Sequence, residues 1–370
     1  MKVIAKGVVW ENPKPYLCSR QAMHPTLVSL GGDEYFCAFD IGQAPESLDY
    51  RTYKARSVDD GGSWDFEGRL VPGETERPST HSIRVSRCGE ELIGFGHRAW
   101  RDHPDEGVLN RENLGYVPMD LVLVRSGDGG RTFSTMEVIE PPLVGPGFEV
   151  CHSVVELAGG RWLAPTSTWR GWDGDLPNGE KGLVLISDDQ GVGWPTFGVT
   201  FDGSAEAVIH WEQSAVALAD DRVLVVSWVY HPESGAHLPN RYTISRDQGE
   251  SFASARELGL VGQTCKACAL EDGRLLFVYR RVDCPGLWAQ LAELKGDSVA
   301  LAEELPLWGT SLIGSGMTGT GNRSDELSGL HFGFPQMVQK DDGSILLVFW
   351  GHEDEVSKIH WMRIELDLNR

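Results

Sequence analysis

Two acidic residues, Asp40 and Glu212, could act together in catalysis because both occupy positions in a pattern that recurs six times along the chain. Glu212 begins one of six segments of equal length, and Asp40 lies sixteen residues after the start of another. Two facing carboxyl groups can cleave a glycosidic bond, since one protonates the leaving oxygen and the other acts as nucleophile or base. We therefore predict that Asp40 and Glu212 are a catalytic pair, with Asp283 and Glu353 as the alternative carboxylates.

Arginine, histidine and aromatic residues collect at the same positions of the six segments and in the loops that follow them. Guanidinium groups bind carboxylates and hydroxyls, and indole rings stack on sugar faces. The predicted substrate-binding residues are His24, His81, Arg98, Trp100, His152, Trp169, Arg170, Tyr230, His231, Arg280, Arg281 and Asp283. Because the protein as a whole carries a net charge of −21, this local gathering of cations predicts a site for an acidic or polyhydroxylated terminal sugar.

The elements that must position these residues are predicted by the segments themselves. Each segment has a polar turn near its middle and an apolar run after it, which predicts a strand, a turn and a second strand. The six segments are His24–Gly42, His81–Ala99, Cys151–Trp169, Glu212–Tyr230, Thr264–Val282 and Phe334–His352.

A second repeat, Ser-x-Asp-x-Gly-x-x-aromatic, occurs four times, starting at Ser57, Ser126, Ser187 and Ser245. Its aspartate can accept bonds from the N–H groups of its own turn, and its glycine can take a positive φ. We expect each copy to be a tight turn between the third and fourth strands of one unit. Four copies of such a turn indicate a repeat architecture.

These four turns resemble the Asp-box of the sialidase superfamily, whose catalytic domains are six-bladed β-propellers. The resemblance implies an all-β, six-bladed propeller that spans residues 1–370 as a single domain. In propellers the start of each inner strand and the loop after the second strand lie at the same mouth, so the candidate site residues are expected to gather there. We expect residues 359–364 to pair with residues 3–10 and close the ring, which leaves few exposed sheet edges.

The catalytic residues of that family are matched only in part. Sialidases have an arginine in a Tyr-Arg-Ile-Pro context where this chain has Met23, and a second arginine where it has Ser227. Their nucleophilic tyrosine corresponds to Phe334, whereas their blade-four glutamate corresponds to Glu212. The comparison predicts a sialidase-like glycoside hydrolase that does not use standard sialidase chemistry.

Two other functions fit the same residues. A polysaccharide lyase acting on uronic-acid glycans needs a His or Tyr base and an Arg, which His81, His152, His231, Tyr230 and Arg280 could supply. A propeller can also serve as a carbohydrate-binding or protein-binding platform without catalysis. A metal held by His24, His81, His152 and Glu212 is not supported by any His-x-His or His-x-x-x-His spacing, so we predict neither a metal nor a cofactor.

Composition restricts the partners and the compartment. The strong negative charge argues against nucleic acid and anionic membranes as partners, because both require a basic surface. The N-terminal residues lack the apolar run of a secretory signal, no stretch approaches the length of a membrane span, and seven cysteines without a paired spacing indicate reduced thiols. Cys265 and Cys268 are expected on opposite faces of one strand. We predict a cytoplasmic protein, and the sequence does not indicate its oligomeric state.

Two loops complete the predictions. Residues 97–118 form a long insertion after the second strand of the second unit, which we expect to wall the site or to contact a second subunit. The glycine-rich run 314–321 lacks the strand–loop–helix context of a phosphate site and predicts a loop before the sixth unit.

Overall fold

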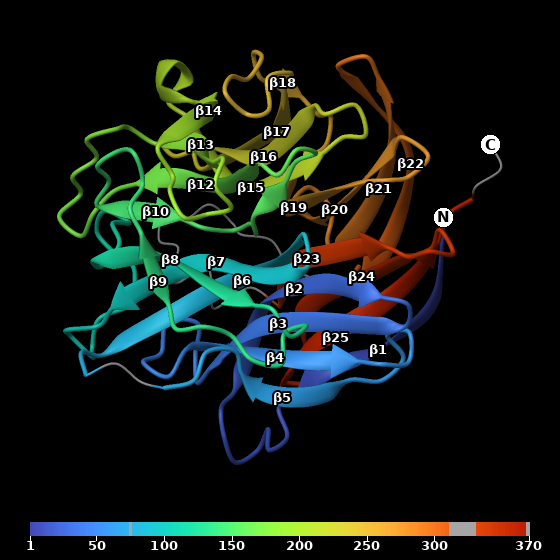
Figure 1. The fold of residues 1–370 in the computed structure, drawn as a ribbon, viewed down its shortest axis with the longest axis horizontal. Coiled ribbons are helices and arrows are strands. Elements are labelled where there is room, and N and C mark those ends of the chain that lie inside the picture. Colours follow the sequence, from blue (N-terminus) through green and yellow to red (C-terminus); the bar gives the residue numbers. More distant parts are fainter. Residues whose placement is uncertain (74–75, 311–330, 368–370) are drawn as a thin grey trace.

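The computed structural model describes residues 1–73, 76–310 and 331–367, and the glycine-rich run 314–321 lies outside these ranges. The described chain forms six antiparallel sheets arranged in a ring (Figure 1). Its helical structure is limited to a short 3-10 turn at Ser204–Glu206. The predicted all-β, six-bladed propeller is therefore confirmed, and each sheet is one blade.

Strands follow chain order within the first five blades, and the first strands of neighbouring blades contact one another around the axis. Blade 1 contains β2 (Gln21–Gly31), β3 (Glu34–Gly42), β4 (Arg51–Ser57) and β5 (Asp65–Arg69). Blade 2 contains β6 (Ser79–Cys88), β7 (Glu91–Trp100), β8 (Met119–Ser126) and β9 (Glu137–Ile139). Blade 3 contains β10 (Gly147–Glu149), β11 (Val155–Glu156), β12 (Trp162–Trp169), β13 (Lys181–Ser187) and β14 (Thr196–Asp202).

The remaining blades follow the same plan. Blade 4 contains β15 (Ile209–Ala217), β16 (Val223–His231), β17 (Ala236–Ser245) and β18 (Arg256–Glu257). Blade 5 contains β19 (Gly262–Ala269), β20 (Arg274–Arg281), β21 (Leu287–Lys295) and β22 (Ser298–Trp308). Blade 6 contains β23 (Phe332–Gln339), β24 (Ile345–Glu353), β25 (Val356–Glu365) and β1 (Lys2–Glu11).

The ring is closed by the N-terminal strand, as predicted. β1 pairs antiparallel with β25 from Lys2 opposite Glu365 to Glu11 opposite Lys358, so the first strand of the chain lies beside β25 (Figure 1). This closure explains why blade 6 has no copy of the Ser-x-Asp-x-Gly turn: its third and fourth strands come from opposite ends of the chain. Blade 5 connects the corresponding strands through the short turn between β21 and β22.

Apolar side chains from each pair of neighbouring blades form a shared core. Six hydrophobic clusters each combine residues of two adjacent blades, including the closing pair, blades 6 and 1. Cys265 belongs to the cluster between blades 4 and 5, and Cys268 packs against the cluster between blades 5 and 6. The prediction that these two cysteines occupy opposite faces of β19 is confirmed.

The four Ser-x-Asp-x-Gly turns connect the third and fourth strands of blades 1 to 4. In the first copy, Asp59 Oδ1 accepts the N–H of Ser63 at 2.8 Å, and Ser57 Oγ accepts the N–H of Gly61 at 2.9 Å. The same bonds recur in the other three copies. The fifth residue of each copy, the glycine of the motif, has a positive φ between 81° and 90°, so the turn has the geometry that its residue types predict.

Blade 3 departs from the predicted pattern. Its first strand is split into β10 and β11, which both pair with β12, and Cys151 lies between them outside the ladder. The Cys151 carbonyl instead accepts a bond from Lys266 Nζ at 2.5 Å. The aligned segment of this blade is therefore strand, loop and strand rather than a continuous hairpin.

The insertion between β7 and β8 lies between its two neighbouring blades. Arg101 donates to the Glu46 carbonyl of blade 1 at 2.9 Å, and Tyr116 N donates to the Arg170 carbonyl of blade 3 at 3.0 Å.

Among the helices of the described ranges, none is long and apolar enough to cross a membrane.

Candidate functional site

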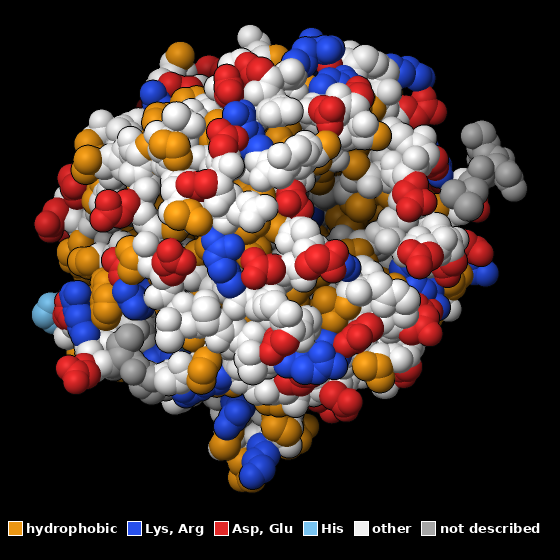
Figure 2. Space-filling view, in the orientation of Figure 1, with side chains coloured by type: hydrophobic (Ala, Val, Ile, Leu, Met, Phe, Trp, Pro, Cys, Tyr) orange, Lys and Arg blue, Asp and Glu red, His pale blue; other side chains and the backbone are white. Residues whose placement is uncertain are grey.

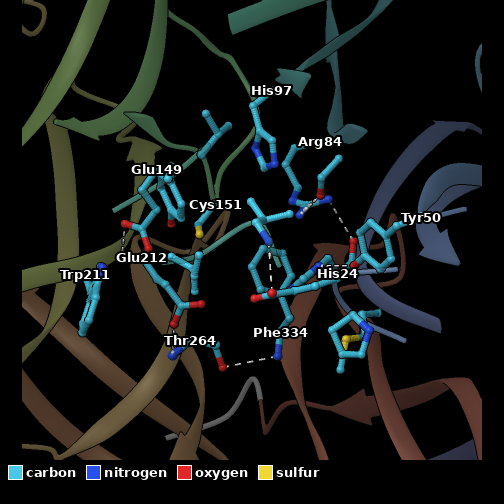
Figure 3. A pocket seen from close by; sticks show the side chains of 18 of the residues that line it. His24, Tyr50, Arg84, His97, Glu149, Cys151, Trp211, Glu212, Thr264 and Phe334 are labelled. Carbon is cyan, nitrogen blue, oxygen red and sulfur yellow. Dashed lines mark hydrogen bonds between the residues drawn. The ribbon is translucent and has the colours of Figure 1, made fainter. Parts of the chain in front are cut away.

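A cavity of about 240 Å³ opens at the mouth where the first strands of the blades begin (Figure 3). Side chains from all six blades line it, together with Val108, Leu109 and Tyr116 of the insertion. The expectation that the insertion walls the site is therefore met. The cavity includes four of the residues predicted for the site: His24, His81, Glu212 and Arg280.

Four residues at the starts of the first strands share an unusual backbone conformation. His24, Glu212, Thr264 and Phe334 have φ values of 53°, 48°, 49° and 49°, and the strand register shifts beside each of them. Positive φ is unfavourable for residues other than glycine, and most of all for a β-branched or aromatic residue. These bulges place the four side chains in the lining of the cavity. In blade 2, His81 pairs regularly with Arg98 instead.

Glu212 is held by two N–H donors. Its Oε2 atom accepts Trp228 Nε1 at 2.6 Å and the backbone N–H of Thr264 at 3.2 Å. Its own backbone N–H donates to Oε2 of Glu149 at 3.2 Å, so a second glutamate lies directly beside it. Figure 3 shows Glu149 and Glu212 on one side of the cavity and His24 and Tyr50 on the other.

Asp40 is fully buried and does not line the cavity. Its carboxylate accepts bonds from Ser82 Oγ at 2.5 Å and Thr52 Oγ1 at 2.6 Å, and forms an ion pair with Arg84 at 3.0 Å. Burial alone would raise the pKa of Asp40, but Arg84 and His24 together hold it well below its usual range. The structure thus places Asp40 behind the cavity wall, as an ionised group that orients Arg84.

Three cationic side chains are buried near the cavity, Arg84, Lys266 and Arg280, and Arg84 and Arg280 line it. Arg84 and Lys266 lie 4.9 and 4.4 Å from the centre of the Phe334 ring, so both cations face this phenyl group. Burial lowers the pKa of Lys266 despite the nearby Cys151, Glu212 and Glu149. Arg280 donates from all three nitrogens, to Gln263 Oε1 and to the Phe332 carbonyl, and burial lowers its pKa to about 10.

The histidines around the cavity are held neutral by burial. Desolvation lowers the pKa of His81 to about 3 and that of His97 to about 4. It also lowers the pKa of His24, whose Nδ1 lies 2.8 Å from the Tyr50 hydroxyl. Burial raises the pKa of that hydroxyl well above its ordinary value.

Glu46 joins the cavity from the loop between β3 and β4. Its Oε2 atom accepts the backbone N–H of Val108 at 3.0 Å, which ties it to the insertion. Burial raises the pKa of Glu46, even though this bond and Arg101 act in the opposite direction. A carboxyl group with a raised pKa can hold the proton that an acid catalyst delivers.

The other predicted binding residues lie outside the cavity lining. Arg98 pairs with Asp120 at 2.6 Å and stacks on Trp100. Trp169 is buried against Trp211, and Tyr230 packs on the same indole. The rest are engaged locally, Arg170 with Glu180, Arg281 with Asp283, His231 with Ser234 and His152 with the Ser153 carbonyl.

Sequence reasoning missed Glu46, Tyr50, Arg84, Glu149 and Lys266. Two of them carried a signal, because Arg84 lies between Ile83 and Val85 and Lys266 lies between Cys265 and Ala267. A cation that such a position buries needs a partner. The other three lie in loops or in the split strand of blade 3, and no spacing marks them. Among the described residues, no group of three or more His, Cys, Asp or Glu side chains could hold a metal ion.

Comparison with protein-family models finds no match for this chain, and no curated protein matches it. Solved structures do match. A protein of unknown function from Dyadobacter fermentans has a TM-score of 0.74 at 18% identity over 99% of both chains. The leech intramolecular trans-sialidase has a TM-score of 0.69 at 10% identity, over 98% of this chain and 70% of its own.

The Trypanosoma rangeli sialidase, solved with sialic acid, has a TM-score of 0.64 at 15% identity, over 93% of this chain and 54% of its own. At these identities the likeness concerns the fold. The chain has the sialidase-like six-bladed propeller that its four turns indicated, while Met23 and Phe334 line the cavity at the positions that differ from the family pattern.

Proposed function

We propose that this protein is a glycoside hydrolase that releases a terminal acidic or polyhydroxylated sugar by carboxylate catalysis in the central cavity. One observation carries the proposal: Glu46, Glu149 and Glu212 all line a single cavity of about 240 Å³ together with the buried Arg84 and Arg280. This volume lies below the usual range for drug-sized ligands and suits one sugar ring. The sialidase-like fold supports the substrate class by analogy.

Glu46 is the acid in this mechanism. Because burial raises its pKa, it retains a proton that can pass to the glycosidic oxygen as the bond from that oxygen to the anomeric carbon breaks. The N–H of Val108 holds Oε2 of Glu46 and so orients the carboxyl group.

Glu212 is the second catalytic carboxylate. Trp228 and the Thr264 N–H both bind its Oε2 atom, so Oε1 is the oxygen that a substrate can approach. It either takes the proton of the attacking water or bonds to the anomeric carbon, depending on its distance from the acid in the complex. Glu149 adds a neighbouring negative charge, which stabilises the positive charge that develops on the sugar ring in the transition state.

Asp40 has a different role in this proposal from the one its position in the sequence suggested. It acts as a positioning residue, since its bonds to Arg84, Ser82 and Thr52 keep Arg84 aimed along the cavity wall.

The direct test is product analysis in H₂¹⁸O, using oligosaccharides that end in sialic acid, a uronic acid, arabinose or rhamnose. Hydrolysis incorporates one ¹⁸O atom into the products, which mass spectrometry detects. Glu212→Gln and Glu46→Gln should each lower kcat by roughly 10²- to 10⁴-fold. Glu90→Gln is the matched control, because Glu90 is 96% exposed in the β6–β7 turn. Full activity of Glu212→Gln would remove this residue from the mechanism.

A polysaccharide lyase is the second candidate function, and the pairing of His24 with Tyr50 favours it. The 2.8 Å contact places a His–Tyr couple near Arg84, as β-elimination of a uronic acid requires: a base for the proton at C5 and a cation for the carboxylate. Cleavage that yields an unsaturated, ultraviolet-absorbing product without ¹⁸O, and that is lost in Tyr50→Phe, would favour the lyase over the hydrolase.

A further inference from the structure

The terminal nitrogens of both arginines that line the cavity are engaged within the protein. Arg280 donates from Nε and both terminal nitrogens to a side-chain amide oxygen and a backbone carbonyl. Arg84 forms an ion pair with Asp40 at 3.0 Å and donates to Ser82 Oγ at 2.7 Å. A guanidinium group whose donors are already used has little to offer the carboxylate of a ligand.

The charged groups that a ligand can reach in this cavity are carboxyl groups. Glu46, Glu149 and Glu212 all line it and are partly exposed, whereas the two arginines are 3% exposed or less. Lys266 lies outside the lining and donates to the Cys151 carbonyl. Because like charges at an interface oppose binding, an anionic sugar is disfavoured beside Glu149 and Glu212.

His24 supplies an acceptor of another kind, because its surroundings fix the position of its ring proton. The Tyr50 hydroxyl donates to Asp40 Oδ2 at 3.4 Å, and His24 Nδ1 lies 2.8 Å from that hydroxyl and 3.3 Å from the same carboxylate oxygen. A proton on Nδ1 satisfies both oxygens, whereas a lone pair there would face the carboxylate. Nε2 is therefore the unprotonated nitrogen of a side chain that lines the cavity and is 34% exposed.

Apolar side chains cover the wall that the insertion and blades 3 and 4 provide. Val108, Leu109 and Tyr116 line it from the insertion, Phe148 from blade 3 and Trp211 from blade 4. A carboxylate against this wall would lose water without gaining a hydrogen bond, whereas the C–H face of a sugar ring can pack on aromatic rings.

We infer that the cavity selects a neutral terminal sugar, that His24 Nε2 accepts a hydrogen bond from one of its hydroxyl groups, and that Glu149 and Glu212 exclude sugar acids. This inference rests on the proposed function, because it assigns the substrate class of the same cavity. It narrows the acidic or polyhydroxylated sugar to a neutral aldose, such as a pentose or a hexose. The hydroxyl groups of such a sugar are donors, which match the carboxylate and imidazole acceptors of the cavity.

The test is a ligand-observed NMR titration of the wild-type protein with neutral aldoses and with the uronic acids of the same configuration. D-glucose and D-xylose are compared with D-glucuronate, and D-galactose and L-arabinose with D-galacturonate. At pH 7, at least one neutral sugar should bind more tightly than its uronic acid, by roughly tenfold or more.

Two variants test the residues to which this preference is assigned, and melting curves check that each variant folds. Glu149→Gln should strengthen the binding of the uronic acid and so reduce the preference, because it removes one of the two repelling charges. Glu112→Gln is the matched control, because Glu112 is exposed on the insertion. His24→Phe keeps an aromatic ring beside Phe334 and should weaken binding of the neutral sugar roughly three- to tenfold, since one hydrogen bond is lost.

Equal affinities, tighter binding of a uronic acid, or no binding of any neutral sugar would overturn the inference. A preference that Glu149→Gln leaves intact, or an affinity for neutral sugars that His24→Phe leaves unchanged, would overturn it as well. Failure of the hydrolase proposal is distinct, because it appears as an absence of ¹⁸O-labelled products while the preference for a neutral sugar persists.

Discussion

At the scale of single residues, the cavity is built around one buried ion pair. Asp40 has no exposed surface, and it accepts bonds from Arg84, Ser82 and Thr52. Removing one partner of such a pair leaves the other charge buried without compensation, which costs more than the pair contributes when intact. The position of Arg84 in the cavity therefore depends on a carboxylate that does not itself touch the cavity.

Replacing Asp40 with Asn should destabilise the protein by about 3–5 kcal/mol, because Arg84 then remains buried without a countercharge. Urea denaturation at pH 7 measures the loss. Since the folded pKa of Asp40 lies below the unfolded value of about 3.9, the stabilisation is fully present above pH 4 and is lost as the pH falls through the folded value.

The difference in the free energy of unfolding between the wild-type protein and Asp40→Asn should accordingly become smaller in strong acid. Asp120→Asn is the control, because Asp120 forms a more exposed pair with Arg98, and pairs of that kind contribute about 0–1 kcal/mol. Equal effects of the two substitutions would contradict the special role assigned to Asp40.

At the scale of elements, the four Ser-x-Asp-x-Gly turns stabilise the blades, whereas the bulges at the strand starts shape the cavity. Each turn satisfies its own backbone through one serine and one aspartate and lies between the third and fourth strands. The bulges at His24, Glu212, Thr264 and Phe334 occur at the cavity. Strained backbone persists where the surrounding structure holds it in place, and here the packed blades hold it at the candidate site.

Two adjacent glycines of the second turn allow backbone strain to be separated from packing. Both have positive φ, 69° at Gly129 and 83° at Gly130. A Cβ atom at Gly130 would lie 2.7 Å from the Phe36 ring of blade 1, whereas one at Gly129 would lie 3.8 Å from the end of Arg131.

Gly130→Ala should therefore destabilise the protein by more than 1 kcal/mol beyond the effect of Gly129→Ala, because only the former adds a steric clash to the strain. Denaturant unfolding of both variants measures the difference. If the two variants lost the same stability, the turn would not be packed against blade 1 as the structure has it.

At the scale of the whole molecule, the ring depends on the seam where β1 meets β25. The cluster between blades 6 and 1 contains Val9 and Trp10 from the N-terminal end of the chain and Trp361 from the C-terminal end. A closed ring of this kind leaves few unpaired edges. Figure 2 shows acidic and basic side chains interspersed over the face in view.

Gly7→Ala tests this seam. Gly7 lies on β1, and a Cβ atom there would approach Trp361 Nε1 to 2.5 Å. Such overpacking costs about 1–3 kcal/mol, so the melting temperature should fall while unfolding stays cooperative. Lys6→Ala, at an exposed position of the same strand, should leave the melting temperature nearly unchanged. A similar fall in the melting temperature of both variants would show that the contact with Trp361 is not its cause.

Buried histidines should make the whole molecule sensitive to acid. His210 and His360 each stack on a phenylalanine outside the cavity, and burial lowers the pKa of both to about 4. Between pH 6.5 and 4 the unfolded chain binds protons that the folded chain does not. As the pH is lowered through this window, the free energy of unfolding therefore falls by up to about 1.4 kcal/mol per pH unit for each histidine.

Replacing both histidines with Gln should flatten the dependence of the melting temperature on pH in this window. His231→Gln is the control, because His231 is half-exposed at the end of β16 and its ring nitrogen bonds to Ser234 nearby. An unchanged pH profile in the double variant would show that other groups govern the acid sensitivity.

Local sequence determined the architecture of this protein. The turns that begin at Ser57, Ser126, Ser187 and Ser245 are stabilised by bonds within eight residues, so their residue types predict their geometry wherever they lie. The strand–turn–strand segments, apart from the one in blade 3, likewise follow from a polar turn and the apolar run after it, and Glu212 was found because it begins one of them. These features depend on residue types and spacings that are fixed along the chain and on bonds between residues close in sequence.

Only the tertiary structure decided which side chains line the cavity. Backbone bulges direct His24, Glu212 and Phe334 into it, and no residue spacing reveals a bulge in advance. Glu46 enters from a loop held by the insertion of another blade, and Asp40 and Arg84 come from different blades. The physical reason is that a charged side chain can be buried only where a partner distant in sequence compensates it, and packing of the six blades creates that partnership.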